Sequence, residues 1–460
     1  MYMSKSKAIS SVKTGNTIQS VYIEDLFGYY TYHLRVDSSN NLYIIYGDNG
    51  SGKTTILKLV FYILSTDSSK GYKTALANTK FKSIVVTLSN GIEVFAKRNE
   101  SAKGGFLYGI RSNGNTYECN VGVEMEGGKP NGNIIVNRDE IINNKGYAAL
   151  TQRIDELEMS VYFLKDNREV MASFKNQLRS RYKRNRAIFE QGLDYAIDGE
   201  LLRRKANLED AKSEIDRAFE RFSDWIKSRV FRFSNIGEKN NKTIYMELIK
   251  SIADSNNNED DSENKFDNKA NILEQLKILS VRNKELSNFG LISDFDYESL
   301  ATVLRGIASP SKLDIISKVL SPFIDGSNAK ILALDEIYNV IISFINYVNE
   351  YFHDKEIRYS FHEGFWITHK NGENVPFNEL SSGEKHLLLL WVNTITADTA
   401  TIFIIDEPEI SLNIKWQRRL LSSLLHFSSG RDIQFVVATH SVELLANNMD
   451  SVVRLVNEHV

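Results

Sequence analysis

The chain has 460 residues, of which 25% are charged and 42% hydrophobic, as in ordinary globular proteins with a sizeable core. Its 56 basic and 59 acidic side chains give a net charge of −3, which excludes a strong positive field over the whole molecule but not a local basic patch. The single cysteine, Cys119, excludes an intrachain disulfide and fits a reducing cytosol. We find no run of about 18 apolar residues, so we expect a cytoplasmic protein without a membrane span.

The N-terminal part is predicted to be rich in strands. Residues 1–16 carry lysines without an apolar core, so we expect a flexible tail rather than a signal peptide. Strands are expected within 17–36 and at 41–46, the second leading into a glycine-rich turn and then an apolar helix at 54–64. Residues 81–98 alternate as two strands around an Asn-Gly turn, which is typical of a hairpin.

The middle of the chain changes to long charged helices after about residue 165. One stretch has apolar residues at heptad spacing, which favours a short coiled coil or bundle face, and we expect Leu208, Ile215 and Phe222 on it to make a nucleotide-independent contact with a second subunit. Its members are Leu208, Ala211, Ile215, Ala218, Phe222 and Trp225. Residues 253–270 begin with an acidic, asparagine-rich stretch, so we expect a mobile loop there, and helical texture resumes over 271–348.

Strand signals return at 358–369, followed by a last block of strands and helices up to about residue 455. The sequence therefore predicts an α/β head domain that is split in sequence, with a helical or coiled-coil domain inserted between its halves. We expect the halves of the head at 17–165 and 351–460 and the insertion at 166–350.

A phosphate-binding loop follows the strand at 41–46. Residues 47–54, Gly-Asp-Asn-Gly-Ser-Gly-Lys-Thr, match the GxxxxGK[ST] pattern in full. Glycines let backbone amides wrap a phosphate, Lys53 supplies a charge for the β- and γ-phosphates, and Thr54 offers a hydroxyl to Mg²⁺. The alternative, a glycine-rich turn that binds nothing, is disfavoured by the flanking strand and helix. The predicted nucleotide-binding residues are Asp48, Asn49, Gly50, Ser51, Gly52, Lys53, Thr54 and Thr55.

An apolar strand at 401–405 ends in two acids, Asp406 and Glu407. A buried parallel strand that ends this way puts both carboxylates at the edge of the sheet where ligands bind. We expect Asp406 to hold Mg²⁺ and Glu407 to act as the general base on the attacking water. The alternative is a strand followed by a charged turn, which is common where such a run stands alone.

Two weaker motifs surround this acidic strand. Residues 380–385, Leu-Ser-Ser-Gly-Glu-Lys, precede an apolar helix and alone indicate only a helix N-cap that could offer amides to an anion. His440 follows another short apolar strand, where its imidazole could contact a γ-phosphate or order the water. A lone histidine at a strand end is more often structural, so only the company of the other motifs makes it a candidate.

In this order, the four motifs resemble the ABC-type P-loop ATPase heads of the SMC and RecF kind, over about 17–150 and 355–455. The resemblance implies an ATPase that uses ATP and Mg²⁺, with Glu407, Lys53 and His440 as catalytic residues. In such heads the signature of one subunit closes the nucleotide site of the other, so a homodimer of heads is implied. The signature residues that would act in trans are Ser381, Ser382, Gly383 and Glu384.

Residues 407–413 and Trp416-Gln417 are similar to the OLD-like group of anti-phage ATPases, and 409–412 resembles the dimer-contact loop of such heads. Asn413 stands where these proteins often have histidine, and we assign it no catalytic role. OLD-type nucleases continue into a TOPRIM domain, whereas this chain ends 20 residues after His440, so a nuclease is expected on another chain.

Stand-alone heads of this kind resemble the AriA ATPases of the PARIS defence system and, as a second choice, the PtuA ATPases of the Septu type. The resemblance implies an oligomeric sensor, such as a hexamer, that holds and releases a separate TOPRIM or HNH nuclease. The alternative is an SMC- or RecF-like repair ATPase that acts directly on DNA. A transporter subunit is disfavoured, because the predicted insertion is too long and too charged.

A basic run at 175–186 contains six bases and no acid. It could be a surface for DNA or for an acidic phage protein that mimics DNA, or it could be a solvated helix face. We favour the solvated face, since charge runs usually have that role. Its basic residues are Lys175, Arg179, Arg181, Lys183, Arg184 and Arg186.

Overall fold

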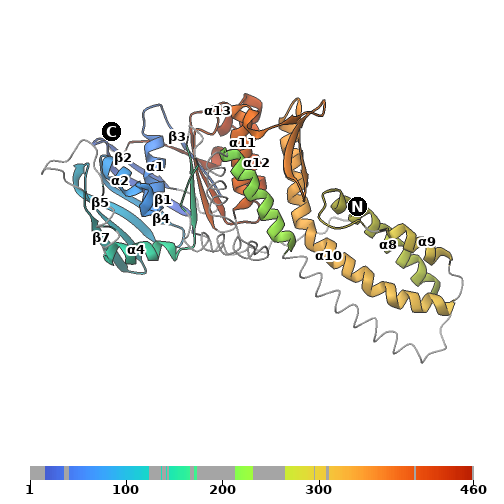
Figure 1. The fold of residues 1–460 in the computed structure, drawn as a ribbon. Helices are drawn as coiled ribbons and strands as arrows, with labels where there is room; N and C mark the ends of the chain where they lie inside the picture. The colour runs from blue at the N-terminus through green and yellow to red at the C-terminus, as the bar shows by residue number, and fades with distance from the viewer. Residues whose placement is uncertain are drawn as a thin grey trace, which may run out of the picture. The chain divides into compact units, whose positions relative to one another are not determined.

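The computed structural model forms two compact units, Met1–Arg204 with Ala397–Val460, and Lys205–Thr396 (Figure 1). The predicted basic run and parts of the predicted tail and mobile loop lie outside the described residues. The residues that the structure describes are 16–35, 41–123, 136, 141, 145–165, 170–173, 213–231, 265–294, 296–306, 310–397 and 400–457.

The first unit contains a six-stranded, mainly parallel sheet in the order β15-β3-β14-β13-β8-β9. Only β9 runs antiparallel to its neighbour, β8. Every residue of β13 and β14 is buried, as expected for central strands that are covered on both faces. The strands are β3 (Leu42–Tyr46), β8 (Ser160–Leu164), β9 (Val170–Ser173), β13 (Thr401–Asp406), β14 (Ile433–Thr439) and β15 (Val452–Arg454).

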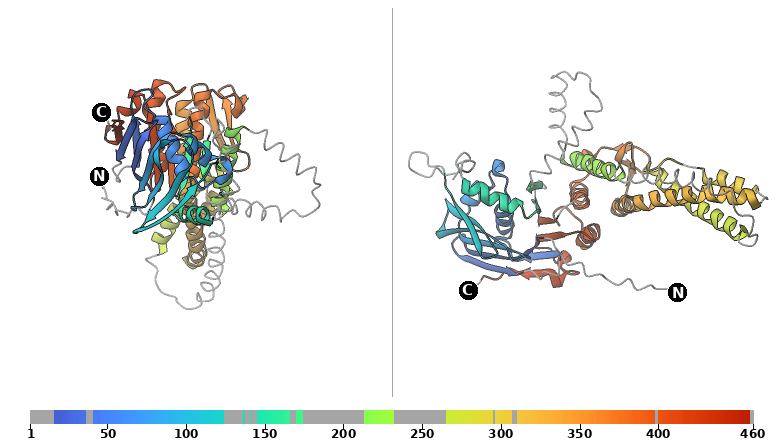
Figure 2. Two further views of the ribbon diagram at one scale, coloured as in Figure 1. Left: turned by 90° about the vertical axis from the view of Figure 1, so that its left-hand side faces the viewer. Right: turned by 90° about the horizontal axis from the view of Figure 1, so that it is seen from below.

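A second, antiparallel sheet of this unit has the order β2-β1-β4-β5-β6-β7. Helix α1 contacts β8, β13 and β14 of the parallel sheet and β5 of the antiparallel sheet, so its apolar side chains join the core between them. The strands of the antiparallel sheet, coloured blue to teal, are seen from two further sides in Figure 2. The elements are β1 (Ile18–Leu26), β2 (Tyr30–Arg35), α1 (Lys53–Leu64), α2 (Tyr72–Asn78), β4 (Phe81–Leu88), β5 (Glu93–Ala102), β6 (Phe106–Ser112), β7 (Asn115–Val121) and α4 (Lys145–Asp155).

Both ends of the chain contribute to the parallel sheet. Strand β3 pairs directly with β14, although almost 400 residues separate them. The buried side chain of Gln434 accepts a hydrogen bond from the Ile18 amide at 2.8 Å and donates one to the Ile18 carbonyl at 2.9 Å, which ties β14 to β1. The predicted α/β head that is split in sequence is therefore confirmed.

The C-terminus of α1 is held by a buried lysine. Lys73 donates to the Tyr62 carbonyl at 2.8 Å, and the Tyr108 hydroxyl donates to the Ile63 carbonyl at 2.6 Å. These carbonyls belong to the last turn of the helix, where they lack partners within the helix and where the helix dipole favours a cation. Burial lowers the pKa of Lys73 to about 7. The helix that starts at the glycine loop is thus fixed at its far end.

The second unit combines a three-stranded antiparallel meander with helices, and residues 214–231 form one of these helices. Helix α10 packs along α8 and β10. The elements are α8 (Lys265–Asn288), α9 (Tyr297–Gly306), α10 (Pro310–Tyr351), β10 (Lys355–Ser360), β11 (Gly364–His369), β12 (Asn374–Val375), the 3-10 turn η2 (Phe377–Glu379) and α11 (Ser382–Thr396).

The predicted heptad face is used inside this unit. Ile215 is 3% exposed and Phe222 is fully buried, with its ring stacked on Phe365 of β11 at 4.7 Å between centroids. The expected subunit contact through Ile215 and Phe222 is therefore wrong, because their apolar surface already lies in the core of the unit. Leu208 and Ala211 lie outside the described residues.

One helix of the described residues is long and apolar enough to cross a membrane, although it contains no unbroken run of 18 apolar residues. Leu320–Tyr351 of α10 has a mean hydropathy of 1.4 over its most apolar window and is long enough to cross a bilayer. Within it, Ile337, Ile341 and Phe344 are fully buried at the three- and four-residue spacing of a helix that packs on one side. A helix in the core of a protein can have the same length and hydropathy as a membrane-spanning helix.

Candidate nucleotide site

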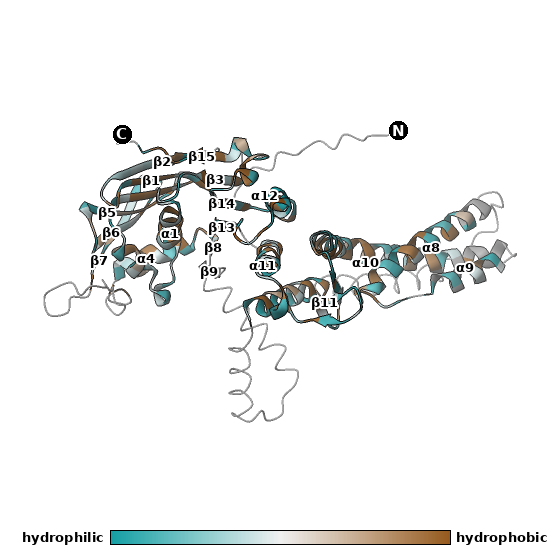
Figure 3. Cartoon of the chain, turned by 90° about the horizontal axis from the view of Figure 1, so that it is seen from above, coloured by the Kyte–Doolittle hydropathy of each residue, from teal (hydrophilic) through white to brown (hydrophobic). Residues whose placement is uncertain are grey.

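Three neighbouring parallel strands, β3, β14 and β13, end within one residue of the same register, and Figure 3 shows them side by side. Tyr46, the last residue of β3, is in register with Thr439 of β14, and Ala438 is in register with Asp406 of β13. The glycine loop follows β3, Glu407 follows β13 and His440 follows β14. The structure therefore brings the glycine loop, the acid pair and the histidine to one edge of the sheet, the edge where ligands bind in open α/β sheets.

The glycine loop has a backbone that side chains would strain. Gly50 and Gly52 have φ of +83° and +88°, the left-handed region that favours glycine. A Cβ on Gly52 would also lie 3.2 Å from Leu26 Cδ2. Helix α1 begins immediately afterwards, so the loop and the first-turn amides of α1 together have the arrangement that can bind an anion.

Lys53 is only 6% exposed, and its ammonium is held by the loop itself. Its Nζ donates to the Gly47 carbonyl at 2.7 Å and to the Asp48 carbonyl at 3.0 Å. Thr54 and Thr55 follow in the first turn of α1 and are half-buried. The Asp48 and Asn49 side chains are exposed. A positive charge is thus already in place beside the amides.

An aromatic turn beside the glycine loop was missed from the sequence. The Tyr32 hydroxyl donates to the Ser51 carbonyl at 2.9 Å, and the Phe27 ring would contact a Cβ on Gly52 at 3.4 Å. Tyr29, in the same β1–β2 turn, is 59% exposed. The signal in the sequence was four aromatic residues within 27–32. This turn offers rings on which a nucleotide base could stack.

The two acids differ in burial and backbone. Asp406 is 2% exposed at the end of β13. Glu407 has a φ of +47°, unusual for a residue with a side chain, and its amide donates to the Ala438 carbonyl at 2.9 Å. Strained backbone of this kind persists where surrounding contacts impose it and is concentrated at functional sites.

His440 lies between two carboxylates. Its Nδ1 is 3.3 Å from Glu407 Oε1 and 3.4 Å from Glu409 Oε1, and half of its side chain is exposed. Sequence reasoning placed Glu409 only in a contact loop, yet it is 5% exposed and belongs to this cluster. Its burial could not be predicted from the sequence, because an acid two residues after the acid pair is typical of a charged turn.

The donor set suits Mg²⁺. The Thr54 hydroxyl and the Asp406 carboxylate are hard oxygen ligands, which Mg²⁺ prefers. Three carboxylates, those of Asp406, Glu407 and Glu409, lie within four residues, and a divalent cation would offset their mutual repulsion. Among the described residues, no group of three or more His, Cys, Asp or Glu side chains forms a ready metal site. A cation here would therefore need ligands from the nucleotide and water.

The serine-glycine motif lies in the second unit, at the start of α11. Ser381 and Ser382 are exposed, whereas Gly383 and Glu384 are buried. The Glu384 carboxylate accepts from the Ser381 amide at 2.7 Å, and the Ser381 hydroxyl accepts from the Glu384 amide at 3.3 Å. This reciprocal arrangement is a capping box. It holds the glutamate inward and leaves the serines at the surface.

Lys355 completes the cap, with Nζ 3.0 Å from Glu384 Oε1. Burial acts to raise the pKa of Glu384, but hydrogen bonds from Ser381 and Lys355 outweigh it, so the pKa lies below its usual range. A depressed carboxyl pKa stabilises the folded state fully above the unfolded pKa of about 4.3. That stabilisation is lost as the pH falls through the lower, folded pKa.

Glu384→Gln is expected to lower the free energy of unfolding by about 1–2 kcal/mol at pH 7, because the charge-assisted bonds to Lys355 and Ser381 weaken. Urea titrations at pH 7 and pH 4 would measure this loss, which should shrink at the lower pH. Glu379→Gln, at an exposed acid in η2, is the matched control. Equal stability of Glu384→Gln and the wild type at pH 7 would show that the cap contributes nothing.

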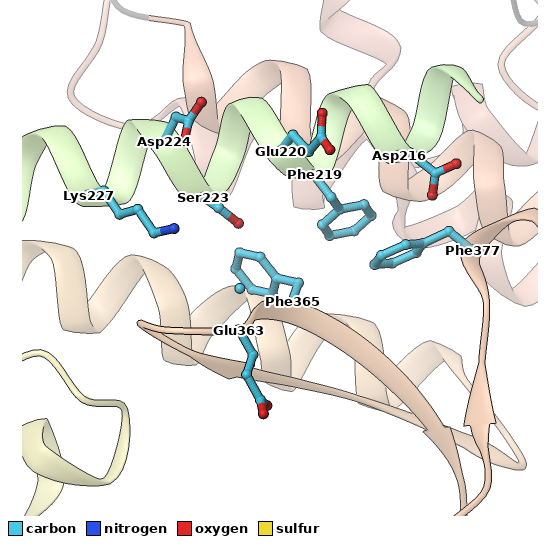
Figure 4. Close-up of a pocket in the computed structure, with 10 residues that line it drawn as sticks. Asp216, Phe219, Glu220, Ser223, Asp224, Lys227, Glu363, Phe365 and Phe377 are labelled. Atoms are coloured by element: carbon cyan, nitrogen blue, oxygen red, sulfur yellow. The ribbon is translucent and has the colours of Figure 1, made fainter. Parts of the chain in front are cut away.

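A separate pocket of about 440 Å³ in the second unit contains none of the predicted site residues (Figure 4). Its apolar part is formed by Phe219, Phe365 and Phe377, with acids along the helix at 214–231. Phe219 and Phe377 stack on each other at 4.2 Å between centroids.

Comparison with known proteins gives one family and a set of distant folds. A search of curated proteins finds no match. Among solved structures, the Smc head domain of Pyrococcus furiosus, bound to the C-terminal domain of ScpA, is 14% identical, with 96% of each chain covered and a TM-score of 0.36. The Smc head of Pyrococcus yayanosii is 13% identical, covering 96% of this chain and 97% of that one, with a TM-score of 0.36. Such distant similarity says nothing of what this chain binds.

Residues 160–446, more than half of the chain, match the family AAA_21, described as "AAA domain, putative AbiEii toxin, Type IV TA system". The matched range contains the serine-glycine motif, the acid pair and His440, and it begins after the glycine loop. With the strand order of the sheet, this match confirms the predicted ABC-type P-loop ATPase head as the fold class. The chain belongs to the AAA_21 family of AAA-domain proteins.

Proposed function

We propose that this protein binds ATP with Mg²⁺ and hydrolyses it to ADP and phosphate. One observation supports this proposal above the others: the glycine loop, the acid pair and His440 follow three neighbouring parallel strands that end in register. A glycine-rich turn without a ligand would not need a buried lysine charge beside it or a strained glutamate across the sheet.

Each residue has a role that follows from its chemistry. The loop amides and Lys53 hold the β- and γ-phosphates, and Tyr29 and Phe27 stack on the base. Thr54 and Asp406 would hold Mg²⁺, which supplies positive charge to the transferring phosphoryl group. Glu407 accepts the proton of the attacking water.

His440 lies beside Glu407, with Nδ1 3.3 Å from Glu407 Oε1. From that place its imidazole contacts the γ-phosphate or orders the attacking water.

We also propose that two heads share the nucleotide. Ser381, Ser382, Gly383 and Glu384 belong to a signature that closes the site of the other subunit. The capping box supports this role, because it fixes the N-terminus of α11 while Ser381 and Ser382 stay exposed. Nucleotide between two protein surfaces then stabilises the dimer by mass action.

In the cell, we propose that the protein works in the cytoplasm as the ATPase of an anti-phage defence complex. It would assemble beyond a dimer, in a ring such as a hexamer, and hold a separate TOPRIM or HNH nuclease. The sequence resemblance to the AriA ATPases of the PARIS system supports this proposal, and the family description names a toxin of a toxin–antitoxin system. The alternative is a repair ATPase that acts directly on DNA.

The test of this proposal is ATP turnover by the purified full chain. Phosphate release is expected with Mg²⁺ and not with EDTA. Thr54 and Asp406 are only two protein ligands, so the metal would be bound mainly by phosphates and water, and EDTA would remove it. Native mass measurement with and without ATP would show the nucleotide-dependent dimer. Turnover that requires DNA would favour the repair alternative, and a lack of ATP turnover, with or without ATP binding, would contradict the proposal.

A further inference from the structure

The buried carboxylate of Glu409 joins the two loops that carry Glu407 and His440. Its Oε1 accepts three hydrogen bonds, from the Thr439 hydroxyl at 2.5 Å, the His440 amide at 3.1 Å and the Ser441 amide at 3.2 Å. All three donors lie at the end of β14 and just after it. Glu409 itself stands in the turn after β13, so a single oxygen atom fastens one turn to the other.

A second link holds the same two turns together. The Gln417 side chain, in α12 (Ile414–Ser428), donates to the Leu412 carbonyl at 2.9 Å and accepts from the Ser441 hydroxyl at 2.8 Å. The turn after β13 is therefore anchored at both of its ends. This second link is uncharged and already fixes the backbone, so the charge of Glu409 has a use beyond holding the turn in place.

That use lies in the position of the histidine ring. Glu409 Oε1 is 3.4 Å from His440 Nδ1 and also accepts from the His440 backbone amide. The carboxylate thus accepts a hydrogen bond from the main chain of His440 and lies near one ring nitrogen of the same residue, which Glu407 Oε1 also approaches, at 3.3 Å. A carboxylate facing Nδ1 favours the tautomer with its proton there, which sets the orientation of the ring and leaves Nε2 for other partners.

We propose that Glu409 is a positioning residue for ATP hydrolysis, which acts through His440 and does not touch the nucleotide. This inference rests on the proposed ATPase function. It explains why a carboxylate that is 5% exposed, with Oε2 buried and without a hydrogen-bond partner in the described part of the chain, is placed beside two further acids. Burying a charge in this way is unfavourable for folding, and a neutral side chain could have made the same turn.

The experiment compares Glu409→Gln with the wild type. Glutamine keeps the size and one acceptor oxygen but removes the charge that faces His440. The expected result is a fall in kcat of about 10- to 100-fold, the range usual for partners that orient a functional histidine, with the Kd for ATP within about twofold. Glu443→Gln, at an acid on α13 (Val442–Leu445) that pairs with Arg418, is the matched control and should keep wild-type kcat.

A double-mutant cycle separates positioning from simple structural support. If Glu409 acts through His440, then adding Glu409→Gln to His440→Ala lowers kcat by less than twofold further. If Glu409→Gln does not fold, Thr439→Val replaces it in the cycle, because this substitution removes one hydrogen-bond donor to the Glu409 carboxylate. It is expected to lower kcat severalfold in the wild-type background and by less than twofold in the His440→Ala background.

Two outcomes would overturn the inference while the wild type still hydrolyses ATP. One is a Glu409→Gln kcat within twofold of the wild-type value. The other is that Glu409→Gln lowers kcat by the same factor in the His440→Ala background as in the wild type, which would show that Glu409 acts independently of the histidine. A wild-type protein that binds ATP without turnover would instead contradict the proposed function, so the two failures are distinct.

Discussion

Lys53→Ala is expected to weaken ATP binding at least a hundredfold, about 3 kcal/mol in binding free energy. The Lys53 ammonium already lies within the loop, donating to the carbonyls of Gly47 and Asp48. Because it is almost fully buried, its charge meets the phosphates with little intervening water and is screened weakly. Alanine removes this charge and leaves those two carbonyls directed at the space that the phosphates would occupy.

Isothermal titration of the full chain with ATP and Mg²⁺ would measure this loss. Lys58→Ala is the matched control, since Lys58 is also on α1, about one turn further along, and plays no part in the proposed site. Its affinity for ATP should match that of the wild type. If Lys53→Ala bound ATP as tightly as the wild type does, the glycine loop would not be a phosphate site.

Glu407→Gln is expected to lower kcat about a thousandfold and to leave the Kd for ATP within about threefold of the wild-type value. A general base contributes roughly 10²- to 10⁴-fold, and the amide cannot take the proton. Binding is spared because the phosphates are held by the loop on a different strand. Gel filtration with ATP should then show a stable assembly, since the nucleotide that joins the heads is no longer consumed.

The fold should tolerate this change well. Glu407 lies beside Asp406 and Glu409, so removal of one negative charge reduces repulsion among the three acids. Glu443→Gln again serves as the control, with unchanged kcat and no trapped assembly. If Glu407→Gln hydrolysed ATP at a rate near that of the wild type, another group would have to activate the water.

Several contacts within the two units could not be predicted from the sequence, for a common physical reason. The heptad spacing at Ile215 and Phe222 showed that the helix has an apolar face, but not whether a second subunit or Phe365 would cover it. Likewise, the aromatic turn holds Tyr32 against the Ser51 carbonyl only because β1 and β2 fold beside the glycine loop. Burial and partner identity depend on segments that are far apart in the chain.

Local patterns, by contrast, were sufficient for the main elements of the head. The spacing of residues 47–54 requires a tight loop between a strand and a helix, and the observed positive φ at Gly50 and Gly52 agrees with it. The apolar run that ends at Asp406 and the hairpin turn near residue 90 depend only on neighbouring residues. These elements follow from backbone preference and short-range periodicity, and both can be predicted from the order of neighbouring residues.

Tertiary structure alone decided how those elements meet. The register of β3, β14 and β13 pairs Tyr46 with Thr439 and Ala438 with Asp406, although these residues come from distant parts of the chain. It also turned Glu409 from an acid in a charged turn into a buried acceptor for Thr439, His440 and Ser441. A side chain's burial is a property of what packs over it, and that packing exists only once both halves of the split sheet have come together.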